Sequence, residues 1–298
     1  MVQYRVGFAA SELGGGLASA VRFAEDFRDA GGGRIRTVLG PHSPYVCPPS
    51  FLAEVAALAK EKGLGLHVHT SESEEQVANS LKAHGLRPVE HLARAGVLDV
   101  PVTLAHALYV DAHELALMAQ PHVSVAHCPS TYAKLAMGVP SLARFTAAGV
   151  RVALGTDGPA SNNDLSMLRA LRMTALLQKL VTADPEAAPS LQVLDWACRH
   201  GAQACGFGDS GVLAPGRAAD LVIIDTRRPH LRPRHDLAAA VVHTAGPGDV
   251  RDVLCDGRWL LRKGELTTLD EERILREAED RALAMVRKNL HTVREYRG

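Results

Sequence analysis

The chain has 298 residues, 47% of them hydrophobic, which is enough to bury a large α/β core as one domain or as a large domain with a small one. Its 33 Lys and Arg balance its 33 Asp and Glu, so composition gives no basic field for nucleic acid and no acidic tail. No apolar run reaches membrane-spanning length, and the N-terminal residues lack a signal-peptide pattern. We therefore expect a cytoplasmic protein with no nucleic-acid or membrane partner. The five cysteines, scattered without a CxxC pair, predict reduced thiols: Cys47, Cys128, Cys198, Cys205 and Cys255.

Short apolar runs alternate with helical patterns through the first two thirds of the chain. Helical patterns include 51–62, with apolar residues at i, i+3 and i+4 spacing, 112–118 behind the N-cap Asp111, and 141–148 behind Pro140. Such repetition predicts a parallel sheet with crossover helices. The expected strands are 4–9, 35–39, 65–69, 102–105, 123–126 and 152–155. These six units are two fewer than a closed (β/α)8 barrel needs.

The last third of the chain has a different pattern. Helical stretches at 164–180 and 190–204 are followed by a Gly/Pro turn and a strand at 221–224. Residues 250–261 predict two strands around an Asp256-Gly257 turn, and 270–296 predicts a charged amphipathic helix. We therefore divide the chain into a barrel domain (1–208), a small β unit (209–266) and a C-terminal helix (267–298).

Polar residues follow the C-terminal end of five consecutive predicted strands. In a (β/α) barrel this end carries the active site, because the loops after the strands converge there. The candidates, in chain order, are His42, His69 with Glu72, His106, His127 and Asp157.

His67 and His69 form an HxH pair. Alternate strand residues share a face, so both could reach one metal. We interpret His67 as a packing or supporting residue, and His69 as a ligand because Glu72 lies beside it and Asp157 follows.

Two carboxylates have both a catalytic and an ordinary interpretation. Glu72, three residues after His69, suits a general acid/base, although a Glu there can also stabilise a helix start, a role we assign to Glu74 and Glu75. Asp157 can bind a divalent metal and accept a proton, although Asp-Gly is also a common turn.

Several segments carry a family likeness. LHVHTSE, LAHALYV, VAHCPSTYAKLAMGVPSL and VALGTDGPASNNDLSMLRALRMTALLQK resemble the amidohydrolase superfamily, above all its methylthioadenosine/S-adenosylhomocysteine deaminases and chlorohydrolase-like relatives. GPHSPYVC at 40–47 and GRAADLVIID at 216–225 resemble the same group. The likeness runs in order from Ile35 to the C-terminus. It implies a (β/α)8 TIM-type metal-dependent hydrolase barrel, with a partial β-sandwich at the C-terminal side.

The resemblance implies one divalent metal, with zinc expected, and His69 and Asp157 among its ligands. By the same resemblance Glu72 protonates the substrate ring, His106 orients the attacking water and stabilises the adduct, and Asp157 takes the proton of that water. His42 and Ser161, together with Glu72, would contact the substrate.

The implied reaction is hydrolytic deamination of an adenine nucleoside, with release of ammonia. One alternative keeps the machinery but changes the substrate to guanine, a pterin or a chlorotriazine. Another is an inactive fragment or pseudoenzyme.

The family pattern also includes a first-strand HxH pair, and the chain has none upstream of Ile35. We therefore expect the first two barrel units and part of the β unit to be missing, leaving poor metal binding and an inactive chain. The exposed sheet edges would favour self-association, so we expect a homo-oligomer.

Overall fold

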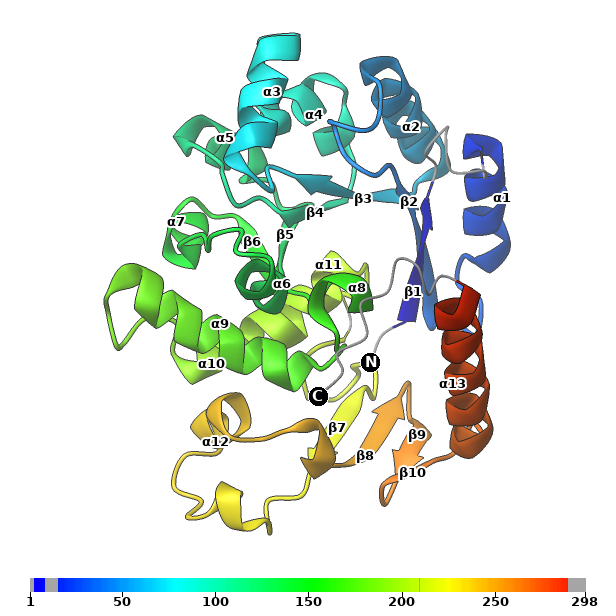
Figure 1. The fold of residues 1–298 in the computed structure, drawn as a ribbon, viewed down its shortest axis with the longest axis vertical. Coiled ribbons are helices and arrows are strands. Elements are labelled where there is room, and N and C mark those ends of the chain that lie inside the picture. The colour runs from blue at the N-terminus through cyan, green and yellow to red at the C-terminus, as the bar shows by residue number, and fades with distance from the viewer. Residues whose placement is uncertain (1–2, 9–15, 209, 289–298) are drawn as a thin grey trace.

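The computed structural model of the protein describes residues 3–8, 16–208 and 210–288. Six parallel strands, hydrogen-bonded in chain order, form a curved sheet with helices along its outer side (Figure 1). The strands are β1 (Gln3–Phe8), β2 (Ile35–Gly40), β3 (Gly65–Thr70), β4 (Val102–His106), β5 (Val123–His127) and β6 (Arg151–Leu154). Within the described ranges, β1 and β6 are the two edges of this sheet. The predicted parallel sheet is thus confirmed. Residue 9, the expected end of the first strand, lies outside the described residues, and the ends of the other five strands lie within one residue of the predicted ones.

Helices connect the strands and cover the sheet. The predicted helix 112–118 is confirmed: the Asp111 carboxylate caps it by accepting a hydrogen bond from the Glu114 amide (2.9 Å). The helical elements of this part are α1 (Leu17–Phe27), α2 (Pro49–Lys62), α3 (Glu74–His84), α4 (Pro88–Arg94), η1 (Val97–Asp99), α5 (Ala112–Met118), α6 (Pro129–Lys134), α7 (Leu142–Ala147), α8 (Pro159–Asn162), α9 (Met167–Thr182), α10 (Ser190–Asp195), η2 (Trp196–His200) and α11 (Gly201–Ala204).

Two predicted helices differ from the structure. The helix expected from residue 164 begins at Met167, because Ser166 accepts a hydrogen bond from the Arg169 amide (3.3 Å) and caps it there. The stretch 190–204 is not one regular α-helix, since a π-helical turn, η2, separates α10 from α11. In that turn the His200 ring donates a hydrogen bond to the Val152 carbonyl (2.9 Å), which ties it to β6.

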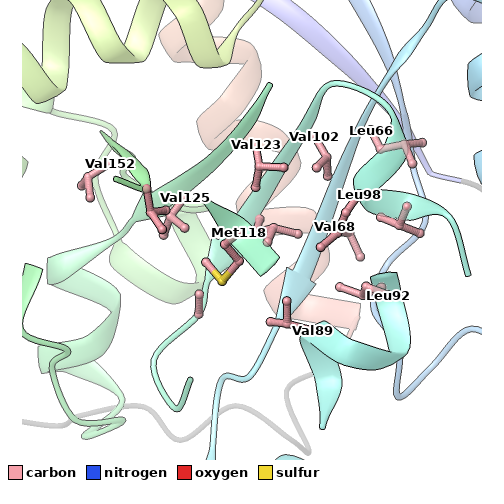
Figure 2. Close-up of a cluster of buried hydrophobic side chains, with 14 of the residues drawn as sticks. Leu66, Val68, Val89, Leu92, Leu98, Val102, Met118, Val123, Val125 and Val152 are labelled. Atoms are coloured by element: carbon pink, nitrogen blue, oxygen red, sulfur yellow. The ribbon is translucent and has the colours of Figure 1, made fainter. Parts of the chain in front are cut away.

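Side-chain alternation divides the sheet into a helix-facing side and an inner side. Along β3, Leu66 and Val68 are buried against the helices, whereas His67 and His69 lie on the opposite face and are half-buried. Figure 2 shows the apolar cluster on the helix-facing side. It includes Leu66, Val68, Val89, Leu92, Leu98, Val102, Met118, Val123, Val125 and Val152.

The chain after α10 fills the inner side near the start of the strands. Thr103, the second residue of β4, donates a hydrogen bond to the Ala204 carbonyl (3.1 Å). Arg36, the second residue of β2, donates to the Gly206 carbonyl (3.5 Å), and its guanidinium lies 5.2 Å from the centroid of the Phe207 ring. With that end covered, the side chains at the C-terminal ends of the strands face the remaining inner space.

A second, antiparallel sheet follows in the order β10-β9-β8-β7. The predicted turn is confirmed, with Asp256 and Gly257 both at positive φ (50° and 71°), as a two-residue hairpin requires. The described residues form one four-stranded sheet here, so the second layer of a sandwich stays a prediction, as do the domain boundaries. The elements are β7 (Leu221–Ile224), η3 (Pro229–Leu231), α12 (Leu237–His243), η4 (Pro247–Asp249), β8 (Val250–Cys255), β9 (Arg258–Arg262), β10 (Glu265–Leu266) and α13 (Glu271–Lys288). Among the described helices, none has the length and apolar character needed to cross a membrane.

The helix-facing core should dominate stability. Leu104 is fully buried, so Leu104→Ala should lower the free energy of unfolding by about 2–5 kcal/mol. Leu180→Ala is the matched control, because Leu180 is 77% exposed and its loss should change stability by less than about 0.5 kcal/mol. Urea denaturation measures both, and equal effects would contradict this assignment of the core.

Candidate functional site

His69, near the end of β3, has a fixed ring orientation. Its backbone amide and its Nδ1 both donate to the His42 carbonyl oxygen, at 2.9 and 2.8 Å. Because a carbonyl only accepts, Nδ1 carries a proton, and in the neutral tautomer this leaves the lone pair on Nε2. A backbone carbonyl that accepts from one ring nitrogen and so fixes the tautomer is typical of metal-binding histidines.

Three imidazoles from three strand ends lie in a row. The His42 ring stacks on His69 (centroids 4.6 Å apart), and His69 stacks on His106 (5.4 Å). The His67 ring is tilted relative to His69, 6.3 Å away. Burial, reinforced by the neighbouring imidazoles, lowers the pKa of His67 to about 4 and also lowers the pKa of His42. Both shifts favour the uncharged forms of His42 and His67 near neutral pH.

The backbone turns His106 into the site. His106 pairs with Thr70, so strand alternation alone would point both side chains toward the helices. The left-handed backbone of His106, with φ of 75°, breaks this alternation. Its Nε2 lies 3.7 Å from Glu72 Oε2, and its buried Nδ1 has no hydrogen-bond partner among the described residues. Burial is the main cause that lowers its pKa to about 4, with a further contribution from His69, so the ring is neutral near pH 7.

Glu72 is a carboxylate held in a largely buried position. Its side chain is 20% exposed, and the Tyr45 hydroxyl donates a hydrogen bond to Oε1. Burial, and secondly the negative charge of Asp157, raise its pKa from 4.5 to about 7. A carboxyl group with this pKa can both give and take a proton near neutral pH, as a general acid/base must.

Asp157 lies at the same end of the sheet, in a strained turn. Its φ is 61°, and its Oδ1 accepts a hydrogen bond from the Gly158 amide (2.6 Å). The Asn162 side chain donates to the Thr156 carbonyl (2.8 Å) and closes the loop. Ser161, in α8, is half-buried, and its amide donates to the Gly158 carbonyl (3.1 Å). Left-handed backbone at a non-glycine residue is costly and concentrates at functional sites.

Sequence reasoning missed the residues that support this cluster. Tyr45 contacts Glu72, and the ring of Tyr132 packs edge-on against His106 (5.8 Å) and His127 (5.1 Å). The Tyr132 hydroxyl accepts a hydrogen bond from the Cys128 amide (2.9 Å), which fixes the ring. Tyr45 stands in the GPHSPYVC segment and Tyr132 in the VAHCPSTYAKLAMGVPSL segment, so both motifs were a signal. Pattern alone could not predict the contacts of Tyr132, because they depend on the turn of α6 that brings its ring to His106.

The donor set fits a divalent metal at two positions. His69 offers Nε2, and Asp157 offers its second carboxylate oxygen. In the described ranges no group of three or more His, Cys, Asp or Glu side chains is arranged to hold a metal ion. A catalytic zinc site usually has three protein ligands and a water, so the described residues supply part of such a site.

Comparison with known proteins assigns the family. The model of the amidohydrolase family matches residues 10–260. The chain belongs to the amidohydrolase family. Among solved structures, an adenosine deaminase from Xanthomonas campestris with bound zinc is similar, with a TM-score of 0.85 and 34% identity over 93% of this chain and 62% of that one. A zinc-bound atrazine chlorohydrolase from Arthrobacter aurescens, in complex with atraton, has a TM-score of 0.81 and 26% identity, covering 88% of this chain and 58% of that one. The chain thus has the amidohydrolase fold, and its parallel sheet fits an α/β TIM-type architecture.

Two curated relatives are similar in sequence. A 5-methylthioadenosine/S-adenosylhomocysteine deaminase from Dictyoglomus thermophilum is 44% identical over 92% of this chain and 64% of its own length. A 5'-deoxyadenosine deaminase from Methanothermobacter thermautotrophicus is 46% identical over 83% of this chain and 57% of its own length. The chain therefore spans less than two thirds of the length of the relatives it matches.

The raised pKa of Glu72 predicts a pH effect that a variant can isolate. In the metal-free protein, ionising Glu72 costs more in the folded than in the unfolded state. Its contribution to stability is therefore favourable below pH 4.5 and is lost as pH rises toward about 7. Relative to Glu72→Gln, the wild-type free energy of unfolding should fall across this window and level off above it.

Urea denaturation of both proteins at intervals between pH 4 and 8 tests this. His106 titrates in both proteins and changes stability in the opposite direction. Subtracting the free energy of unfolding of Glu72→Gln from that of the wild type removes this shared contribution. A difference that does not vary with pH would contradict the raised pKa.

Proposed function

We propose that the protein acts in the hydrolytic deamination of adenine nucleosides of the methylthioadenosine and S-adenosylhomocysteine type, releasing ammonia. The observation that carries this proposal is the position of Glu72, a buried carboxyl group with a pKa of about 7, 3.7 Å from the neutral ring of His106. An acid that is half-protonated near neutral pH is what protonation of a weakly basic ring nitrogen requires.

Each residue then has a step in the reaction. Glu72 protonates the ring nitrogen next to the carbon that bears the amino group, which makes this carbon electrophilic. A water molecule adds to that carbon, and Asp157 accepts the proton that the water loses. The His106 ring, neutral and anchored at the end of β4, orients the water and hydrogen-bonds the oxygen of the tetrahedral adduct. Asp157 then gives this proton to the amino group, the carbon–nitrogen bond breaks and ammonia leaves. The hydroxyl of the adduct becomes a carbonyl, and its proton returns to Glu72.

We propose a divalent metal, zinc, as the cofactor, with His69 and Asp157 as two of its ligands. When bound, such an ion supplies Lewis-acid activation of the attacking water. The proposal is supported by the tautomer of His69, which leaves Nε2 available, and by the zinc found in solved relatives. Since the described residues give only part of a ligand set, we further propose that activity requires a further HxH-bearing segment, which would also extend the sheet toward an eight-stranded barrel.

The proposed substrate class is supported by how similar the sequence is to relatives of different named activity. Identity is 44% and 46% to relatives named as adenine-nucleoside deaminases, against 26% to the chlorohydrolase. His42, stacked beside His69, and Ser161, in α8, are the residues we expect to contact the nucleoside.

An activity assay tests the proposal directly. The chain should be assayed with zinc, alone and fused behind an HxH-bearing N-terminal segment of a deaminase relative, for ammonia release from methylthioadenosine and S-adenosylhomocysteine. We expect activity in the fusion, and Glu72→Gln should reduce kcat roughly 100-fold or more. Asp157→Asn should reduce both kcat and bound zinc, whereas Glu72→Gln should leave the zinc content unchanged.

Glu74→Gln is the matched control, because Glu74 is an exposed carboxylate in the first turn of α3, two residues from Glu72. It should keep full activity. A zinc-loaded fusion with no activity on either nucleoside, or a fully active Glu72→Gln variant, would refute the proposed function or the role of Glu72.

A further inference from the structure

An open cavity of about 640 Å³ lies at one end of the antiparallel sheet. The end of β7, the start of β8 and the end of β9 meet there, because neighbouring strands of this sheet run in opposite directions. None of the residues that we propose for the deaminase reaction lines this cavity. Its wall is rich in positive charge. The cationic residues that line it are Arg227, Arg228, Arg251, Arg262 and Lys263.

The carboxylates that line the same cavity already have partners within the protein. The two oxygens of Asp225 accept hydrogen bonds from the Arg227 guanidinium, at 2.9 Å each. Asp252 accepts one from Arg251 Nε (2.5 Å) and one from the backbone amide of Lys263 (2.7 Å). These two carboxylates therefore neutralise the charges of two arginines and leave the Lys263 ammonium group unpaired.

The third carboxylate, Asp249, is also occupied. Its Oδ2 accepts a hydrogen bond from the Gly246 amide (2.8 Å) and lies 2.9 Å from His230 Nε2. Because both partners come from the protein, Asp249 does not need a cation from the cavity wall.

Three cations of the cavity remain. Within the described part of the chain, no carboxylate forms an ion pair with Arg228, Arg262 or Lys263. The Arg262 guanidinium lies over the ring of Trp259, 5.1 Å from its centroid, a contact that orients the guanidinium without neutralising it. With five cations against three carboxylates, the lining has a formal excess of two positive charges. A concave surface with such an excess attracts and concentrates anions.

We propose that this cavity binds an oligophosphate group, a ligand separate from the nucleoside reaction proposed above. A diphosphate carries about three negative charges near neutral pH, which matches the three cations without a carboxylate partner. A guanidinium donates two parallel hydrogen bonds to phosphate oxygens, and a lysine ammonium adds a compact charge. The group belongs either to inorganic diphosphate or to a nucleotide. For a nucleotide, the ring of Trp259, which is 36% exposed in the cavity, offers a surface on which the base can stack.

Isothermal titration calorimetry tests the proposal on the 298-residue chain, dialysed against a chelator so that no metal binds the phosphate. Inorganic diphosphate should bind with a dissociation constant below about 1 mM at low salt. Arg262→Gln and Lys263→Gln should each raise this constant at least fivefold. Arg258→Gln is the matched control, because Arg258 is exposed on the same strand, β9, but does not line the cavity. Its dissociation constant should stay within about twofold of the wild-type value.

Two further ligands distinguish the source of the phosphate and the role of bulk charge. Binding of ADP more tightly than diphosphate would assign the site to a nucleotide, and equal binding would assign it to the phosphate group alone. Citrate, which has a similar charge, should bind more weakly than diphosphate. The proposal is overturned if diphosphate does not bind, if citrate binds as tightly, or if Arg258→Gln weakens binding as much as Arg262→Gln and Lys263→Gln do. Since no deaminase activity is measured, the outcome is independent of the proposed function.

Discussion

Parallel hydrogen bonding between β3 and β4 aligns His69 with Ala105 and Thr70 with His106, and the same pairing continues through β5 to β6. Because all strands run in one direction, their last residues meet at one end of the sheet. The rest of the candidate site depends on this constraint. His106 and Asp157 then have left-handed backbone conformations, which direct their side chains differently from strand alternation. Ala107, next to His106, belongs to the apolar cluster on the helix-facing side.

Burial gives this cluster its chemistry. Removing the imidazoles from water disfavours their charged forms, so His67 and His106 remain neutral well below pH 7. The same loss of solvent acts in the opposite direction on a carboxyl group, and the charge of Asp157 adds to it, so Glu72 retains its proton up to about pH 7. The same main cause, exclusion of water by burial, therefore favours both the neutral histidines and the protonated form of Glu72.

The local sequence pattern was sufficient to predict the structural elements that depend on residues close together in sequence. The Asp111 cap, the Asp256-Gly257 turn and the strand ends all follow from residues a few positions apart. The start of α9 was predicted at residue 164, but the structure places it at Met167, because the Ser166 side chain accepts a hydrogen bond from the Arg169 amide. Contacts between segments that are distant in sequence could not be predicted from local pattern. One example is Tyr132 in α6, whose ring packs against His106 at the end of β4.

Three buried histidines, His91, His106 and His127, have ring nitrogens without a hydrogen-bond partner among the described residues, and the last two lie beside the candidate site. Leaving a buried polar atom without a hydrogen bond costs about 1–3 kcal/mol, so a fold retains one only for a reason. The unpartnered Nδ1 of His106 belongs to a ring whose Nε2 faces Glu72, in the space where we propose the reacting atoms to lie. His127 has both nitrogens buried without a partner and faces Tyr132, and nothing in the described residues accounts for it. Burial lowers the pKa of His127 to about 3, so it contributes no charge; its effect on the site is mechanical, through the Tyr132 ring that it shares with His106.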